Sequence, residues 1–277
     1  MESAPSLSEV ELYDTDLTYD AQRGRLVSLQ CLKKCYVSGQ QLSSTLFDHL
    51  LIPVGADLTI ELYLSHPRIE DYLPKSLDNL RNFPSFNKID IFFDRRDHRL
   101  QFSGPNGRVC FEFYTSEFGA TRIVLESLAL FDTSKMRELE LTGSNLLSDN
   151  LPCRALLPMK NLRIFTIPQC HNLSSFFRAL DPSLGSSKVL ICPKLEKLEL
   201  NIVTEKGFDV RSLISMAAAR ASRGAKLESV RIISRVELVP MVLLELREHV
   251  LYVEYEPPAG KEEEQVSYSD DDSDEED

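Results

Sequence analysis

Apolar residues recur in this chain at the first, fourth and sixth positions of short segments. The stretch "CPKLEKLELN" places Leu195, Leu198 and Leu200 in this pattern, with charged residues between them. An amphipathic helix would instead carry apolar residues at i, i+3, i+4 and i+7, and a half-buried strand would alternate strictly. The pattern therefore predicts a strand over Leu198 to Leu200, with Leu195 leading in from a bend.

The same pattern occurs in six further segments and, more weakly, in an eighth. Most neighbouring copies lie about 25 to 33 residues apart, a period that is typical of stacked leucine-rich repeats. The alternative is an ordinary α/β protein that places a short apolar strand about every 30 residues. The additional copies are Leu7, Val10 and Leu12; Leu32, Cys35 and Val37; Phe86, Ile89 and Ile91; Met136, Leu139 and Leu141; Leu162, Phe165 and Ile167; Leu227, Val230 and Ile232; and the weaker Leu58, Ile60 and Leu62.

Segments with helix signals follow several of these predicted strands. The longest carries an apolar stripe from Phe208 to Ala217, has Arg220 and Arg223 in its last turn and ends at Gly224. Cations and a glycine are the residues expected at a helix C-terminus. A strand and a helix in each unit predict a parallel sheet on one face and helices on the other. The predicted helices cover residues 43–51, 74–83, 172–180, 207–224 and 238–250.

A β-hairpin interrupts the period between residues 86 and 136. Strands are predicted at 89–93, 100–102 and 109–114, and Asn106-Gly107 is a strong signal for a tight hairpin turn. The asparagine or cysteine usual three residues after the last repeat leucine is clear only as Cys170. We therefore predict an α/β fold, an irregular leucine-rich-repeat solenoid over residues 1–256, with a hairpin elaboration near 89–114.

Residues 257–277 form an acidic tail. Residues 261–277 contribute −9 of the formal net charge of −12, so the remaining chain is close to neutral. Such a composition predicts a disordered segment, because it offers too little apolar surface to bury. Ser267, Ser269 and Ser273 each precede an acidic residue by three positions, a pattern that acid-directed kinases accept. The alternative is that the tail only increases solubility.

Catalytic and cofactor motifs are missing from the sequence. The five histidines (49, 66, 98, 171 and 249) stand in separate segments, and neither a two-histidine metal spacing nor a glycine-rich phosphate loop occurs. We therefore predict that the protein is not an enzyme and needs no metal or cofactor. A pI near 5.0 without a basic stripe disfavours nucleic acid as a partner.

The compartment follows from further absences in the sequence. No run approaches the roughly 18 apolar residues of a membrane span, and the N-terminal residues lack the basic and apolar regions of a signal peptide. The six cysteines include no C-x-x-C pair, as expected of a reduced chain. We predict a cytoplasmic or nuclear protein with no membrane partner.

Three longer stretches resemble the leucine-rich C-terminal region of the large F-box protein family of agaric-type fungi. They are "LSSTLFDHLLIPVGADLTIEL", "LPKSLDNLRNFPSFNKIDIFF" and "LISMAAARASRGAKLESVRI". The shared features are a helix of L-L-D-H-L type (residues 46–50), a turn at Pro53, a strand ending in Thr59-Ile60, and a helix exit over residues 219–228. The resemblance covers roughly residues 5 to 256.

The resemblance implies a solenoid that captures a protein target for a ubiquitin ligase. No F-box segment precedes Leu7, so a ligase adaptor is an expected partner only if an F-box lies upstream; otherwise the chain binds a target without docking a ligase. The alternative function is that of a nuclear acidic leucine-rich protein, which binds basic partners such as histones through its body and tail.

The repeat pattern also predicts a binding surface. The third, fifth and seventh positions of each copy face away from the core, because side chains alternate along a strand. Tyr36 and Phe92 are the expected anchors, and Glu140 and Glu199 would steer a positively charged partner. Alternatively this face is only solvated, or the hairpin at 94–114 folds over it and buries Phe92. The candidate protein-binding residues are Tyr13, Tyr36, Phe92, Glu140, Thr166, Glu199 and Arg231.

Overall fold

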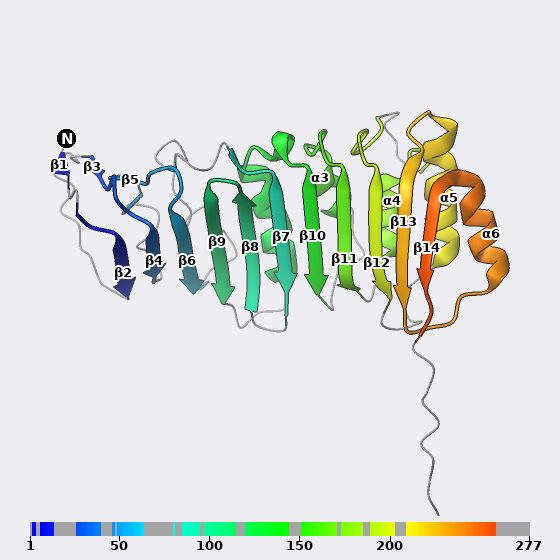
Figure 1. Cartoon of the computed structure of the whole chain (residues 1–277), viewed down its shortest axis with the longest axis horizontal. Coiled ribbons are helices and arrows are strands. Elements are labelled where there is room, and N and C mark those ends of the chain that lie inside the picture. Colours follow the sequence, from blue (N-terminus) through cyan, green and yellow to red (C-terminus); the bar gives the residue numbers. More distant parts are fainter. Residues whose placement is uncertain are drawn as a thin grey trace, which may run out of the picture.

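A large sheet and a layer of helices behind it make up the computed structural model of this chain (Figure 1). The sheet has eleven strands in the order β14-β13-β12-β11-β10-β7-β8-β9-β6-β4-β2. The α/β class with a mostly parallel sheet is confirmed. The residues that the structure describes are 2–3, 6–13, 26–39, 46–47, 49–63, 80, 85–94, 97–114, 120–143, 151–170, 173–184, 189–202 and 209–258.

The strands of this sheet coincide with the repeated apolar segments. The inward-facing positions are buried, as predicted, except that Val10 and Leu12 are only partly buried. Leu139 and Leu198 are 2% and 0% exposed. Leu7 is 39% exposed, because it precedes the edge strand. The strands that match the pattern are β2 (Glu9–Tyr13), β4 (Lys34–Ser38), β6 (Asp57–Tyr63), β7 (Lys88–Phe93), β10 (Glu138–Gly143), β11 (Ile164–Cys170), β12 (Lys197–Ile202) and β13 (Leu227–Ser234).

A repeated backbone motif joins one unit to the next at the start of the strands. The carbonyl oxygen of the second residue of a copy accepts hydrogen bonds from two backbone N–H groups at the start of the neighbouring strand. The N to O distances lie between 2.7 and 3.2 Å. The shared acceptor satisfies two donors that the sheet ladder does not reach. The same bond pair at five places shows that the units stack in one register. The five acceptors are Ser8, Asn87, Arg137, Arg163 and Glu196.

Helices pack side by side behind the sheet, each on the next one along the chain. Three predicted helices are confirmed, as α4 (Ser174–Leu180), α5 (Val210–Ser222) and α6 (Pro240–His249). The short helices α2 (Ala120–Ser127), α3 (Leu151–Leu156), η3 (Leu128–Leu130) and η4 (Thr133–Lys135) were not predicted, nor was the last strand, β14 (Val250–Glu256). None of the helices in the described ranges is long and apolar enough to cross a membrane.

Two helix predictions need correction where the structure describes them. The helix predicted over 43–51 is wrong at its end, because Leu50–Leu51 form the strand β5. In the segment 74–83 the one described residue, Leu80, forms a parallel bridge with Ile52. β5 belongs to a small parallel sheet with β1 (Glu2–Ser3) and β3 (Val27–Ser28), seen at the upper left of Figure 1. Strands of two residues leave no periodic signal in a sequence.

The predicted hairpin elaboration is confirmed and lies within the sheet. β8 (Asp97–Gly104) pairs antiparallel with β7 on one side and with β9 (Gly107–Tyr114) on the other, and it is the sole antiparallel strand of this sheet. β9 then pairs in parallel with β6, and β7 with β10. The turn requires a glycine at position 107, where φ is +110°. The hairpin thus fills the sheet between two stacks of parallel strands.

Candidate interaction surface

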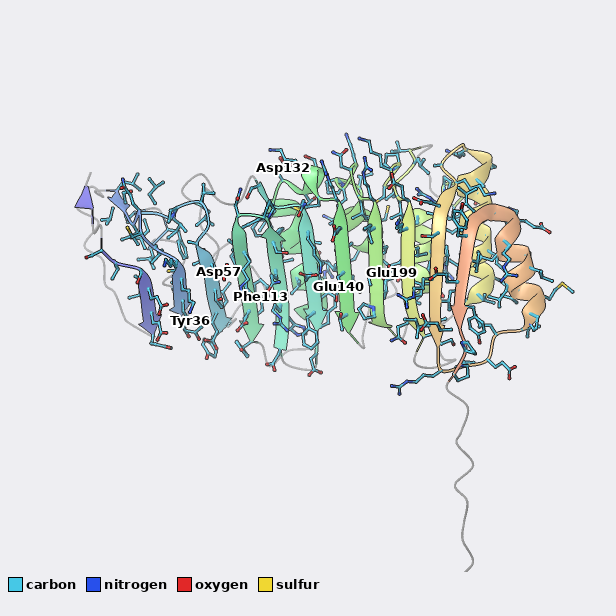
Figure 2. The ribbon with its side chains drawn as sticks, viewed as in Figure 1. Tyr36, Asp57, Phe113, Asp132, Glu140 and Glu199 are labelled. Carbon is cyan, nitrogen blue, oxygen red and sulfur yellow. The ribbon has the colours of Figure 1, made fainter. Side chains whose placement is uncertain are left out.

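The face of the sheet opposite the helices carries straight rows of side chains. Strand pairing places one residue from every strand in a middle row, which includes five of the seven predicted binding residues. Figure 2 labels three of them, Tyr36, Glu140 and Glu199, on β4, β10 and β12. The row is Glu11, Tyr36, Thr59, Cys110, Gln101, Asp90, Glu140, Thr166, Glu199, Arg231 and Glu254.

The two other predicted residues lie in the next row toward the strand ends. That row contains Tyr13, Ser38, Glu61, Glu112, Arg99, Phe92 and Thr142. Pro168 is the seventh position of the copy that begins at Leu162, so strict alternation would place it in this row, but the register shifts and Thr142 pairs with Gln169. The physical reason for this shift is that proline has no N–H to donate to the ladder, which favours a bulge at this position.

Phe92 remains at the surface and does not lie beneath the hairpin. Its cross-strand neighbour Arg99 places the guanidinium carbon 5.4 Å from the centre of the Phe92 ring. This distance is within the range of a cation–π contact. The predicted alternative, in which the hairpin folds over the face, is therefore wrong, because the hairpin strands continue the sheet.

Several charged residues in the middle of the face are paired with one another. The Lys88 Nζ lies 2.8 Å from Asp90 and 3.0 Å from Glu140. Partial burial pulls the pKa of Lys88 down, but its hydrogen bonds with the two carboxylates outweigh burial and raise that pKa above its ordinary value. Arg231 likewise pairs with Glu254 at 3.7 Å and with Glu256. Glu140 and Arg231 thus already have partners of opposite charge in the free protein.

A cluster of tyrosines and glutamates covers the face over β2, β4, β6 and β9. Each of three strands ends in a Glu-x-Tyr sequence, and the Tyr hydroxyl donates to the Glu two residues earlier. The donor–acceptor distances are 2.9 Å for Tyr13 and Glu11, 2.8 Å for Tyr63 and Glu61, and 3.5 Å for Tyr114 and Glu112. We call this set the tyrosine–glutamate patch: Glu11, Tyr13, Tyr36, Glu61, Tyr63, Glu112 and Tyr114.

Contacts between strands hold the patch together. The Tyr36 hydroxyl also donates to Glu61, so this carboxylate accepts from tyrosines on two strands. The rings of Tyr13 and Tyr36 lie 5.2 Å apart, and those of Tyr63 and Tyr114 stack at 5.4 Å. Such pairs contribute roughly 0.5–1.5 kcal/mol beyond the area they bury. The patch is therefore an ordered surface in the free protein.

Two tyrosines of the patch, Tyr13 and Tyr114, remain protonated at neutral pH. The hydrogen bond to Glu11 raises the pKa of Tyr13 above its ordinary value. Burial, together with the nearby charges of Glu112, Glu61 and Asp97, raises the pKa of Tyr114 to about 12. A negative field disfavours ionisation of a phenol, so the patch presents neutral hydroxyls beside its carboxylates.

Sequence reasoning found only two members of this patch, Tyr13 and Tyr36, among the binding residues. A signal for the others was present, because Glu-Leu-Tyr occurs at 11–13 and 61–63 and Glu-Phe-Tyr at 112–114. The sequence could not show that these motifs lie side by side. The pairing of β6 with β9 brings them together, because it aligns Glu61 with Glu112 and Tyr63 with Tyr114.

The described residues show neither a metal cluster nor an activated thiol at the buried cysteines Cys35, Cys110 and Cys192. Within those ranges, no group of three or more His, Cys, Asp and Glu is placed to hold a metal ion. Burial raises the pKa of the Cys35 and Cys192 thiols to about 12, and burial with the charge of Glu112 does the same for Cys110. Thiols with such pKa values carry almost no thiolate at neutral pH. The candidate phosphorylation sites Ser267, Ser269 and Ser273 lie outside the described residues.

Comparison with protein-family models, with curated proteins and with solved structures finds no match to this chain. The function must therefore be inferred from the sheet face and its chemistry.

Proposed function

We propose that this protein is an irregular leucine-rich-repeat solenoid that binds a protein target on the open face of its sheet. The observation that carries the proposal is the position of the described helices, which all lie behind one face of the sheet; none of them lies on the opposite face (Figure 1). An open face with ordered rows of side chains is the extended type of surface with which stacked-repeat proteins bind their partners.

Exposed aromatic side chains on this face support a binding role. Tyr13, Tyr63 and Tyr252 are 58%, 43% and 66% exposed. A solvated surface has no need of large exposed rings, whereas tyrosine is enriched at the centres of protein interfaces. The surrounding charges would then fix the orientation of the partner and exclude partners of the wrong charge.

The resemblance to the C-terminal region of the agaric F-box family gives this binding a purpose. We propose that the bound target is presented for ubiquitination, with a ligase adaptor as a further partner if the full protein carries an F-box. Support comes from the stretches that resemble that family and from the stacked strand register.

One feature favours a second candidate, a nuclear acidic protein that binds basic partners such as histones. Residues 261–277 carry −9 of the formal net charge, which would attract cationic proteins. In this case the tail would contribute to every interaction, whereas a target-recognition solenoid would bind without it. Removal of the tail therefore distinguishes the two functions.

The experiment is proximity labelling in cells with four forms of the chain. They are the wild type, a face variant (Tyr36→Ala, Phe92→Ala and Glu140→Ala), a chain without residues 261–277, and a control variant on α6 (Glu245→Ala, Arg247→Ala and Glu248→Ala). The control residues are exposed on the helix layer. We expect the face variant to lose partners that the other three forms keep. A folded face variant that keeps every partner would contradict the proposal, and loss of basic partners without the tail would favour the second candidate.

A further inference from the structure

We propose that the tyrosine–glutamate patch binds an arginine-rich segment of the protein target. This inference rests on the proposed function, because it assigns one part of the open sheet face to a partner of stated chemistry. It follows from three features of the patch: its negative charge, its exposed rings, and an arginine–ring contact that the protein already makes on the same face.

The carboxylates of the patch lack cationic partners in the described part of the chain. Among those residues, no ion pair joins Glu11, Glu61 or Glu112 to a lysine, arginine or histidine. Two nearby cations are engaged at the opposite ends of the strands, where Lys34 lies 3.4 Å from Glu9 and Arg108 lies 3.4 Å from Asp57. A third, Arg99, is the cross-strand neighbour of Glu112, and its guanidinium lies over the Phe92 ring. In the middle of the face, by contrast, Lys88 pairs with Asp90 and Glu140, and Arg231 pairs with Glu254 and Glu256.

The carboxylates are instead held by tyrosine hydroxyls. A carboxylate has about four acceptor positions, and Glu61 uses two of them for Tyr36 and Tyr63. These bonds fix the direction of the carboxylate but leave its charge in place. Further acceptor positions therefore remain for a charged donor that approaches from solvent.

The rings add a second requirement on the ligand. A guanidinium is planar, can donate two parallel hydrogen bonds to a carboxylate and stacks on aromatic faces. The protein shows this geometry itself, since Arg99 lies over Phe92 in the row that also contains Glu61 and Glu112. An arginine of the target would find a ring and a carboxylate side by side at each of the three Glu-x-Tyr sequences.

Other ligand classes fit the patch less well. Phosphate groups and nucleic acids would be repelled by the three carboxylates. An apolar segment would displace the water that is hydrogen-bonded to those carboxylates and hydroxyls, and it would offer no hydrogen bonds in return. A basic peptide segment both balances the charge and keeps the polar groups bonded, so the chemistry of the patch selects it.

The test measures binding of a fluorescently labelled Arg-Gly repeat peptide to the full chain by fluorescence anisotropy near physiological ionic strength. The patch variant is Glu61→Gln with Glu112→Gln, and the matched control is Glu245→Gln with Glu248→Gln on α6. Both variants lose two charges and keep the acidic tail, so peptide bound by the tail contributes equally. We expect the patch variant to bind about tenfold more weakly than the wild type, and the control to bind within about twofold of it.

A second readout locates the peptide independently of any variant. The chain has nine tyrosines and no tryptophan, and four of the tyrosines belong to the patch. The unlabelled peptide should therefore change the intrinsic tyrosine emission of the wild type with the same midpoint as the anisotropy. A Glu-Gly repeat peptide should leave both signals unchanged.

Failure of this inference can be told apart from failure of the proposed function. Equal peptide affinity in patch and control variants would overturn the arginine-binding role of the patch, while the labelling experiment could still support a target on the sheet face. Retention of every cellular partner by the face variant would overturn the proposed function, whatever the peptide result. Circular dichroism of each variant confirms that it is folded.

Discussion

Single residues show how burial changes the role that a sequence suggests. Arg220 falls in the last turn of α5, where the sequence suggests an exposed cation facing the helix dipole. The structure buries it completely, and its guanidinium donates to the carbonyl oxygens of Ile191 at 2.9 Å and Cys192 at 2.8 Å. These bonds hold the loop before β12, in which Cys192 has a φ of +47°. Helix periodicity could not reveal this role, because the acceptors lie in a distant loop.

His98 provides a prediction about pH at the same scale. Its side chain is 5% exposed, close to the Phe93 ring, and its Nδ1 has no hydrogen-bond partner among the described groups. Burial lowers the pKa of His98 below its ordinary value, although the charges of Asp97 and Asp94 act in the opposite direction. The unfolded chain therefore binds this proton at a higher pH than the folded chain does.

The sign of the effect follows from this difference. As the pH falls below about 6.5, the unfolded state gains a proton that the folded state resists, so the free energy of unfolding decreases. We expect His98→Gln to lose part of the decrease in thermal midpoint that the wild type shows between pH 7.5 and pH 5.5. His249→Gln is the control, and a parallel pH profile for wild type and His98→Gln would contradict the prediction.

At the scale of the element, the L-x-x-L-x-L pattern predicted strands better than it predicted helices. Its positions fix which strand face is buried, and alternation then fixes the outer rows. Helix α2 was missed because its sequence, "ATRIVLES", contains three β-branched residues, which favour strands. β14 was missed because α6 runs directly into it, without the leading leucine and bend that mark the other strands.

Leu198 tests the strand assignment. It is fully buried in β12, between Phe165 of β11 and Val230 of β13. Leu198→Ala should lower the free energy of unfolding by roughly 2–5 kcal/mol, because it leaves a cavity in a packed core. The change is measured by denaturant titration against Lys197→Ala, whose side chain faces outward. A Leu198→Ala variant as stable as the control would show that the repeat does not form the core.

For the whole molecule, the sequence predicted the two layers but not the order of the strands. Spacing alone could not show that β9, rather than β7, follows β6 in the sheet, because pairing between distant strands leaves no local signal. The rows on the open face of the sheet were therefore predicted in part: the alignment of the middle row was correct, and the patch formed by β6 and β9 was missed. Each Glu-x-Tyr motif can be read from the sequence, but only the strand order of the sheet shows that the three lie on one part of the face.

The acidic tail gives a prediction at this scale. Its composition predicts that residues 261–277 bury no apolar surface, so their removal should leave the thermal midpoint unchanged. The measurement is differential scanning calorimetry of the full chain and of a chain ending at residue 260. A clear shift of the midpoint in either direction would show that the tail contacts the folded body.

The place of the hairpin in the sheet has a consequence for synthesis on the ribosome. The strands β2, β4 and β6 can pair as soon as they emerge, but the free edge of β6 must wait for β9, which begins at Gly107. At roughly 5–20 residues per second, that wait lasts a few seconds. Because β7, β8 and β9 follow one another in the sequence, they can form the hairpin first through local contacts. The hairpin can then pair with the open edge of β6 in one docking step. The sheet therefore grows as two stacks joined by the hairpin, and the time needed to synthesise the hairpin sets how long a nascent chain exposes an edge that other chains can pair with.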